Sequence, residues 1–200
     1  PGGAAASEDQ GKQQADEAMV AYRKALEVKP DFIEAHVAML DQLWAQGSAD
    51  DAAKQLEILK KVAPNALATT FHETLVAYRK KDLKRAATLS QQLVQAAPEN
   101  LRSQLLAGEI ALASNAPAQA IGPLSEAVRL APESVRARRM LVRAYLGAGR
   151  PAKALGILQP MLSGDKADSA THQLAGEVYL YNGDPKKAQD LGKEKKQLDG

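Results

Sequence analysis

The chain has 200 residues, of which 45% are hydrophobic and 25% are charged, and its formal net charge is +2. This composition is typical of a packed, folded protein, and the near-balanced charge carries no overall signature of nucleic-acid binding. Cysteine is absent, which excludes disulfides, cysteine nucleophiles and thiolate metal sites, and no apolar run is long enough to cross a membrane.

Residues 1–8 begin without methionine and show no signal-peptide pattern. They predict a disordered end, or one added by cloning, so we expect the chain to be a piece of a longer protein. The first predicted helix spans about residues 9–29. It stands alone, as the second helix of a half repeat over residues 9–32.

The sequence repeats with a period of 34 residues. One ladder of identical residues consists of prolines at Pro30, Pro64, Pro98 and Pro132. A second ladder in the same register consists of alanines at Ala18, Ala52, Ala86, Ala120, Ala154 and Ala188. Agreement of two ladders in one register indicates a repeat architecture.

Each period predicts two helices joined by a short turn. The first helices are expected at about 33–46, 67–80, 101–114, 135–148 and 169–182. The turn residues are Gly47, Lys81, Asn115, Gly149 and Gly183; glycine accepts the left-handed conformation that ends a helix. Three second helices then open with proline, which the first helical position tolerates, and Ser48, Asp82 and Asp184 are predicted N-caps.

The stretch "LAGEVYLYNGDPKKA", residues 174–188, carries glycine, tyrosine, aspartate and alanine at the places where the tetratricopeptide repeat has them. With the 34-residue period, the chain resembles that family from about residue 33 to residue 200. The resemblance implies an all-α, right-handed α-solenoid of about eleven helices that acts as a protein-interaction scaffold. The expected repeats form one continuous array over 33–66, 67–100, 101–134, 135–168 and 169–200.

A narrower resemblance rests on "VRARRMLVRAYLGAGRPAKALGILQPML" together with residues 174–188. These segments are similar to the tetratricopeptide-repeat lipoprotein associated with the PEP-CTERM/exosortase system of exopolysaccharide-producing bacteria. That likeness implies a role in the bacterial periplasm or envelope, in the export of polysaccharide or of sorted proteins.

In the tetratricopeptide family, the first helices line a concave groove, and the second, fifth, ninth, twelfth and thirteenth places of each helix face it. The resemblance therefore implies candidate binding residues at Trp44, Phe71, Leu75, Tyr78, Arg102, Glu109, Arg136, Arg139 and Arg143. At 100° per residue, the last three arginines fall within about 60° of one another, whereas Arg138 points elsewhere. Arginine suits recognition of carboxylate, phosphate or sulfate. The alternative is a solvated face, or ion pairs with Glu109 and Glu177.

The first helix of the second repeat, "LATTFHETLVAYRK", is unusually polar at packing positions, with Thr70, Glu73 and Thr74. A buried carboxylate must find hydrogen bonds or shift its pKa. Either the helix rotates and leaves Phe71, Leu75 and Tyr78 as an apolar patch in the groove, or a polar contact crosses the interface between repeats.

Nothing in the sequence predicts an enzyme, a cofactor or a metal site. His36, His72 and His172 are dispersed through the repeats, and no phosphate-binding loop or nucleophile motif is present. The lysine–asparagine pair by which some family members bind carboxylate termini is absent from every first helix.

Two functions remain: a scaffold that binds a protein or peptide in the groove, or direct binding of an anionic polysaccharide or acidic peptide by the arginines. Nucleic acid is not an expected partner.

Overall fold

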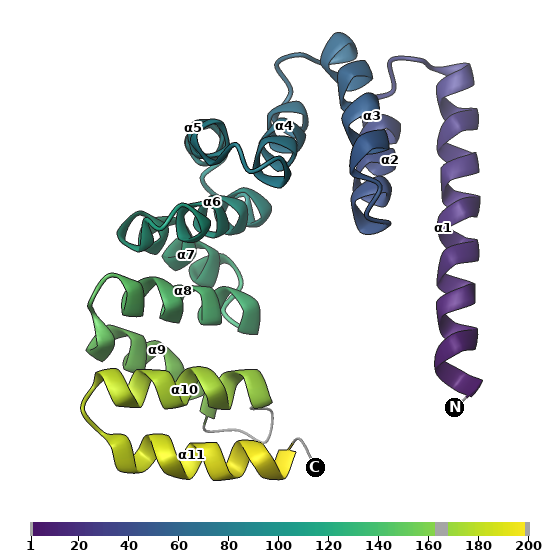
Figure 1. The fold of residues 1–200 in the computed structure, drawn as a ribbon. Coiled ribbons are helices and arrows are strands. Elements are labelled where there is room, and N and C mark those ends of the chain that lie inside the picture. The colour runs from purple at the N-terminus through teal and green to yellow at the C-terminus, as the bar shows by residue number, and fades with distance from the viewer. Residues whose placement is uncertain (1, 163–167, 199–200) are drawn as a thin grey trace. The chain divides into compact units, whose positions relative to one another are not determined.

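The computed structural model describes residues 2–162 and 168–198, and these residues form α-helices and short connections without β-strands (Figure 1). The eleven helices are α1 (Gly2–Val28), α2 (Ile33–Ala45), α3 (Ala49–Val62), α4 (Leu67–Arg79), α5 (Leu83–Ala96), α6 (Leu101–Ala113), α7 (Pro117–Leu130), α8 (Val135–Gly147), α9 (Pro151–Leu162), α10 (Ser169–Tyr181) and α11 (Pro185–Leu198). The predicted fold class, an all-α solenoid of paired helices, is confirmed. The first helices are α2, α4, α6, α8 and α10, and the second helices follow them.

Helix α1 differs from the expected half repeat at its start. It begins at Gly2, whereas the sequence predicts its start at about residue 9. Alanines at residues 4–6 favour this extension because alanine has the highest helix propensity. The helix ends at Val28, which lies one period before Val62 at the end of α3.

All five turns between the paired helices adopt the left-handed backbone conformation at the predicted positions. The φ angles are 73° at Gly47, 63° at Lys81, 55° at Asn115, 68° at Gly149 and 79° at Gly183. A non-glycine residue costs more free energy there than glycine. Lys81 and Asn115 adopt it nevertheless, which shows that the packing of the two helices dictates the turn.

The predicted N-caps are correct at two of three positions. The carboxylates of Asp82 and Asp184 each accept a hydrogen bond from the backbone N–H three residues later, at 3.1 Å in both cases. The prediction for Ser48 is wrong, since its side chain makes no capping hydrogen bond. Its backbone ψ of 66° lies outside the extended region that N-cap residues usually adopt.

The alanine ladder lies in the core of the inner helix pairs. Ala52, Ala86, Ala120 and Ala154 have no exposed surface. Around them pack leucines of the second helices, including Leu56 and Leu59 in α3 and Leu124 in α7. Ala18 and Ala188, at the two ends of the ladder, are only partly buried because fewer helices cover them.

The connections before the first helices are fixed by a recurring hydrogen bond to a proline carbonyl. The fourth residue of three first helices donates a side-chain N–H to the ladder proline six residues earlier. The pairs are His36 Nε2 with Pro30 at 2.9 Å, Gln104 Nε2 with Pro98 at 2.7 Å, and Arg138 Nε with Pro132 at 2.7 Å. Arg138 therefore points away from the other arginines of α8, as predicted, and stabilises the connection into its own helix.

The chain forms two compact units, residues 1–89 and residues 90–200, and the boundary in the sequence falls within α5. One continuous array is expected from the sequence. Because each repeat contacts only its neighbours, few contacts cross any one helix of such an array, and a division can fall inside it. The two units are described separately below as unit 1 and unit 2.

Candidate functional site

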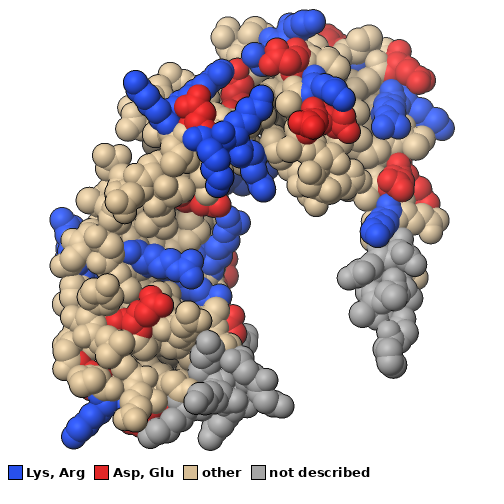
Figure 2. All heavy atoms as spheres, viewed as in Figure 1, with Lys and Arg blue, Asp and Glu red and all other residues tan. Residues whose placement is uncertain are grey.

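The predicted arginines lie on a surface of unit 2 that we call the first-helix face. It is formed by the second, fifth and ninth places of α6, α8 and α10, and α8 contacts both of its neighbours. Its charged residues are Arg102, Glu109, Arg136, Arg139, Arg143 and Glu177. Figure 2 shows basic side chains over α6 and α8 with acidic side chains beside them. The face is thus mixed in charge.

Arg136 is paired across the two helices, as one alternative from the sequence predicts. Its Nη2 lies 2.8 Å from Oε2 of Glu109 on α6, and the two side chains are 66% and 37% exposed. An ion pair with this exposure stabilises the fold by only about 0–1 kcal/mol. Its main effect is to neutralise the guanidinium charge on this part of the face.

Arg139 is the most buried of the three arginines, with 20% of its side chain exposed. Its guanidinium pairs with the carboxylate of Asp168 and donates to Oγ1 of Thr171 from Nε at 3.0 Å and from Nη2 at 2.7 Å. Asp168 also caps α10, accepting from the backbone N–H of Thr171 at 2.9 Å. Arg139 therefore ties α8 to the start of α10.

The contacts of Asp168 change its acidity. The hydrogen bond from Arg139 comes first and the bond from the Thr171 backbone N–H second, and together they lower the pKa of the Asp168 carboxyl to about 2. Both contacts favour the charged form, which outweighs the small opposing effect of burial. The sequence does not predict Asp168 as the partner of Arg139, because Asp168 lies in a connection and not at a groove place.

Arg143 is exposed and differs from the other two arginines. Among residues 10–162 and 168–192, no hydrogen bond or ion pair involves its guanidinium. Glu177, the other acidic partner predicted for the stripe, is exposed on α10 and is not paired with it. The structure thus divides the predicted stripe into two neutralised arginines and one available arginine.

In unit 1, the predicted groove residue Trp44 belongs to the interface between two first helices. Its Nε1–H donates to Nδ1 of His72 on α4 at 3.1 Å. His72 is 1% exposed, and its Nε2 faces Oδ1 of Asp41 at 3.8 Å. The bond from Trp44 makes Nδ1 an acceptor, so the proton is assigned to Nε2. Trp44 therefore stabilises the stacking of α2 and α4.

The predicted apolar patch of unit 1, Phe71, Leu75 and Tyr78, is half-buried. Phe71 meets the His72 ring edge-to-face with centroids 5.5 Å apart, and Nζ of Lys81 lies 6.0 Å from the centroid of Tyr78. These side chains contribute much of their surface to packing.

Glu73 resolves the question raised by the polar sequence of α4. Its Oε1 lies 3.4 Å from Nζ of Lys60 on α3 and 3.8 Å from Nη2 of Arg85 on α5. The alternative of a polar contact with neighbouring helices is therefore correct. Thr74 is fully buried and donates to the carbonyl of Thr70 at 2.7 Å. Glu73, Lys60 and Arg85 line a recess of about 170 Å³, which Lys80 and Asp82 also line.

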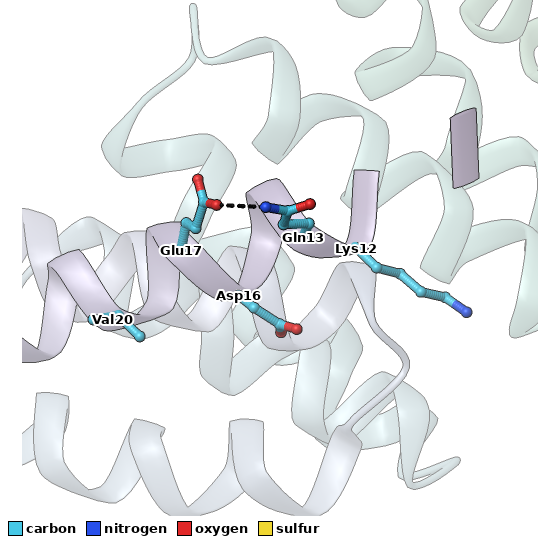
Figure 3. Close-up of a pocket in the computed structure, with 5 residues that line it drawn as sticks. All are labelled: Lys12, Gln13, Asp16, Glu17 and Val20. Atoms are coloured by element: carbon cyan, nitrogen blue, oxygen red, sulfur yellow. Dashed lines mark hydrogen bonds between the residues drawn. The ribbon is translucent and has the colours of Figure 1, made fainter. Parts of the chain in front are cut away.

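A wider, open recess of about 610 Å³ lies along α1 (Figure 3). Lys12, Gln13, Asp16, Glu17 and Val20 line it, and Nε2 of Gln13 donates to Oε1 of Glu17 at 3.0 Å. Because all five residues come from one helix, no second element shapes a specific site there.

The described part of the chain holds no group of three or more histidine, aspartate or glutamate residues placed to hold a metal ion. Among the described helices, none is both long and apolar enough to cross a bilayer.

Comparison with family models decides the affiliation of the chain. One tetratricopeptide repeat model matches residues 111–178, and another matches residues 37–100 and 73–134. The chain belongs to the tetratricopeptide repeat family. The matches run across both units and cover most of α2, all of α3 to α9 and most of α10. No curated protein matches the chain, so the narrower resemblance to the PEP-CTERM-associated lipoprotein stays a prediction.

Solved tetratricopeptide repeat structures share the fold. YrrB, described as a TPR protein with an unusual peptide-binding site, is 18% identical with a TM-score of 0.74, over 89% of this chain and 92% of that chain. PilF of Pseudomonas aeruginosa is 18% identical with a TM-score of 0.76, over 94% and 86%. MamA of Desulfovibrio magneticus is 20% identical with a TM-score of 0.73, over 84% and 94%. At these identities the likeness shows the fold alone.

Proposed function

We propose that this tetratricopeptide repeat protein is a non-catalytic scaffold that binds a peptide segment of a partner on the first-helix face of unit 2. The observation that carries the proposal is that the first helices pack on one side and leave side chains exposed on the other. On α10, Leu174, Ala175 and Val178 belong to a core cluster shared with α8 and α9. Gln173, Glu177, Leu180 and Tyr181 of the same helix are exposed.

Aromatic and apolar side chains beside a charged rim suit a peptide ligand. Leu180 is 58% exposed and Tyr181 is 69% exposed, and tyrosine is enriched among the residues that contribute most to protein interfaces. YrrB, with the same fold, is described as having a peptide-binding site, which supports the class of ligand by analogy of fold.

A long anionic polysaccharide, the alternative from the sequence, fits this face less well. Binding of a polyanion draws on several unneutralised basic groups, whereas Arg136 and Arg139 are already paired with carboxylates. The exposed carboxylate of Glu177 would also repel it. The envelope setting implied by the narrower resemblance stays a prediction that depends on the partner's identity.

The proposal is tested by selecting ligands from a random dodecapeptide library displayed on phage. Selected peptides are then titrated into isotope-labelled protein and followed by NMR. We expect shift changes on α6, α8 and α10 and little change on α7 and α9. Failure to enrich any peptide, or shift changes confined to the second helices, would contradict the proposal.

A further inference from the structure

We propose that Arg143 is the anchor for a carboxylate of the bound peptide, and that an acidic side chain is therefore the feature that the first-helix face of unit 2 recognises. This inference rests on the proposed function and names the chemistry of its ligand. It also assigns different roles to three arginines that the sequence places on one stripe.

The repeat register explains why Arg143 lacks a partner. Glu109 stands at the ninth place of α6, and its partner Arg136 stands 27 residues later at the second place of α8. The ninth place of one first helix thus meets the second place of the next. Arg143 occupies the ninth place of α8, and the residue 27 positions later is Ala170. The second place of α10 therefore holds the methyl group of Ala170, whereas the second place of α8 holds an ion-pair partner, Arg136.

The neighbouring carboxylate is already engaged. Asp168 binds Arg139 and caps α10 through the backbone N–H of Thr171. Its low pKa, about 2, keeps it charged, with Arg139 as the main cause and the Thr171 N–H as the second. A carboxylate held by two donors in this way does not release to Arg143 without loss of both contacts.

The occupant that fits is therefore a peptide with one acidic side chain near apolar ones. One available guanidinium matches one carboxylate, for which its planar donors are suited. One helical turn beyond Glu177, α10 also exposes Leu180 and Tyr181, which offer apolar contact area that a peptide can use. Charge complementarity and the exposed apolar surface point to the same class of ligand.

The test uses two pools of fluorescein-labelled nonapeptides that differ only at the central position, fixed as glutamate in one pool and as glutamine in the other. All other positions are random mixtures of apolar residues and serine. Binding is measured by fluorescence anisotropy at 50 mM and 300 mM salt. We expect the wild-type protein to bind the glutamate pool about five- to tenfold more tightly at the lower salt concentration, as an exposed charge-assisted hydrogen bond allows.

Four variants separate the anchor from the rest of the face. Arg143→Gln is expected to abolish the preference between pools, whereas Arg136→Gln keeps it. Ala170→Glu supplies Arg143 with the intrachain partner that Arg136 already has, so it is expected to abolish the preference without altering Arg143. Ala170→Gln is its matched control and keeps the preference. Thermal melts establish that each variant is folded.

The outcomes distinguish the two proposals. If the wild-type protein binds the two pools equally well, the proposal that Arg143 anchors a carboxylate is overturned, and the proposed peptide-binding function stands. If it binds neither pool, both proposals are overturned. Polygalacturonate and heparin are titrated in parallel. Tighter binding of either one than of the glutamate pool, lost in Arg143→Gln, would identify a polyanion as the ligand and overturn the peptide.

Discussion

At the scale of single residues, the arginines of α8 differ in their contacts: Arg136 and Arg139 are paired with carboxylates, and Arg143 is exposed. Helical geometry alone places Arg136, Arg139 and Arg143 on one stripe, and it makes Glu109 a candidate partner for one of them. It does not find Asp168, because a residue outside the helices has no place in the helical register. Nor does it show that Trp44 turns to His72, since that contact depends on the spacing of two helices.

The Arg139–Asp168 pair makes a pH-dependent prediction. The folded pKa of Asp168, about 2, lies below the ordinary value of about 3.9. Its contribution to the free energy of unfolding is therefore present above about pH 4 and is lost as the pH falls toward 2. Replacing Arg139 with glutamine removes the largest cause of the shift. We expect a deficit in stability of about 1 kcal/mol or less at pH 7, discounted for the exposure of Asp168.

The measurement is urea denaturation of wild type and Arg139→Gln between pH 2 and pH 7, with NMR titration of the Asp168 carboxyl. The deficit should shrink between pH 4 and pH 2, and the pKa of Asp168 should rise in the variant. Arg143→Gln is the control and should match wild type throughout. A deficit that is independent of pH would show that Arg139 stabilises the fold through packing and not through this pair.

At the scale of helices, the 34-residue period predicts the bounds of the five first helices to within about one residue. Turn positions follow from it even where lysine or asparagine replaces glycine, because the repeat fixes the geometry and the residue adapts. The close approach of paired helices is less evident in the sequence. Gly108 of α6 has no signal of its own, yet a Cβ there would lie 2.4 Å from Cγ of Leu124 on α7.

That contact predicts the effect of adding a single methyl group. Leu124 is fully buried, so it has no free space into which to move, and Gly108→Ala is expected to lower the free energy of unfolding by about 1–3 kcal/mol. Gly156→Ala on α9 is the matched control, because Gly156 is exposed and no proline directly follows it. No atom lies within 4 Å of its added Cβ, and alanine in an exposed helix should stabilise by about 0.5–1 kcal/mol. Denaturant midpoints that shift equally for both variants would refute the close approach.

At the scale of the whole molecule, the sequence predicts the number and order of the helix pairs but not where the array divides. The periodicity is the same on both sides of residue 89, and only three-dimensional contacts reveal the two units. A stack in which each repeat meets only its neighbours should transmit a local perturbation over a short range. The free energy of unfolding of each segment then depends on that segment's own repeats and on their contacts with adjacent repeats.

Ala120→Leu tests this locality. Ala120 is fully buried on α7 against Met140, Leu141 and Ala144 of α8, so a larger side chain should overpack the site by about 1–3 kcal/mol. Hydrogen exchange should accelerate in α6, α7 and α8, while α2 and α3 of unit 1 keep their protection because each repeat contacts only its neighbours. Ala118→Leu makes the same change at an exposed position of the same helix and should leave both regions as in wild type. Acceleration of equal size in α2 and α3 would show that the two units unfold as one cooperative body.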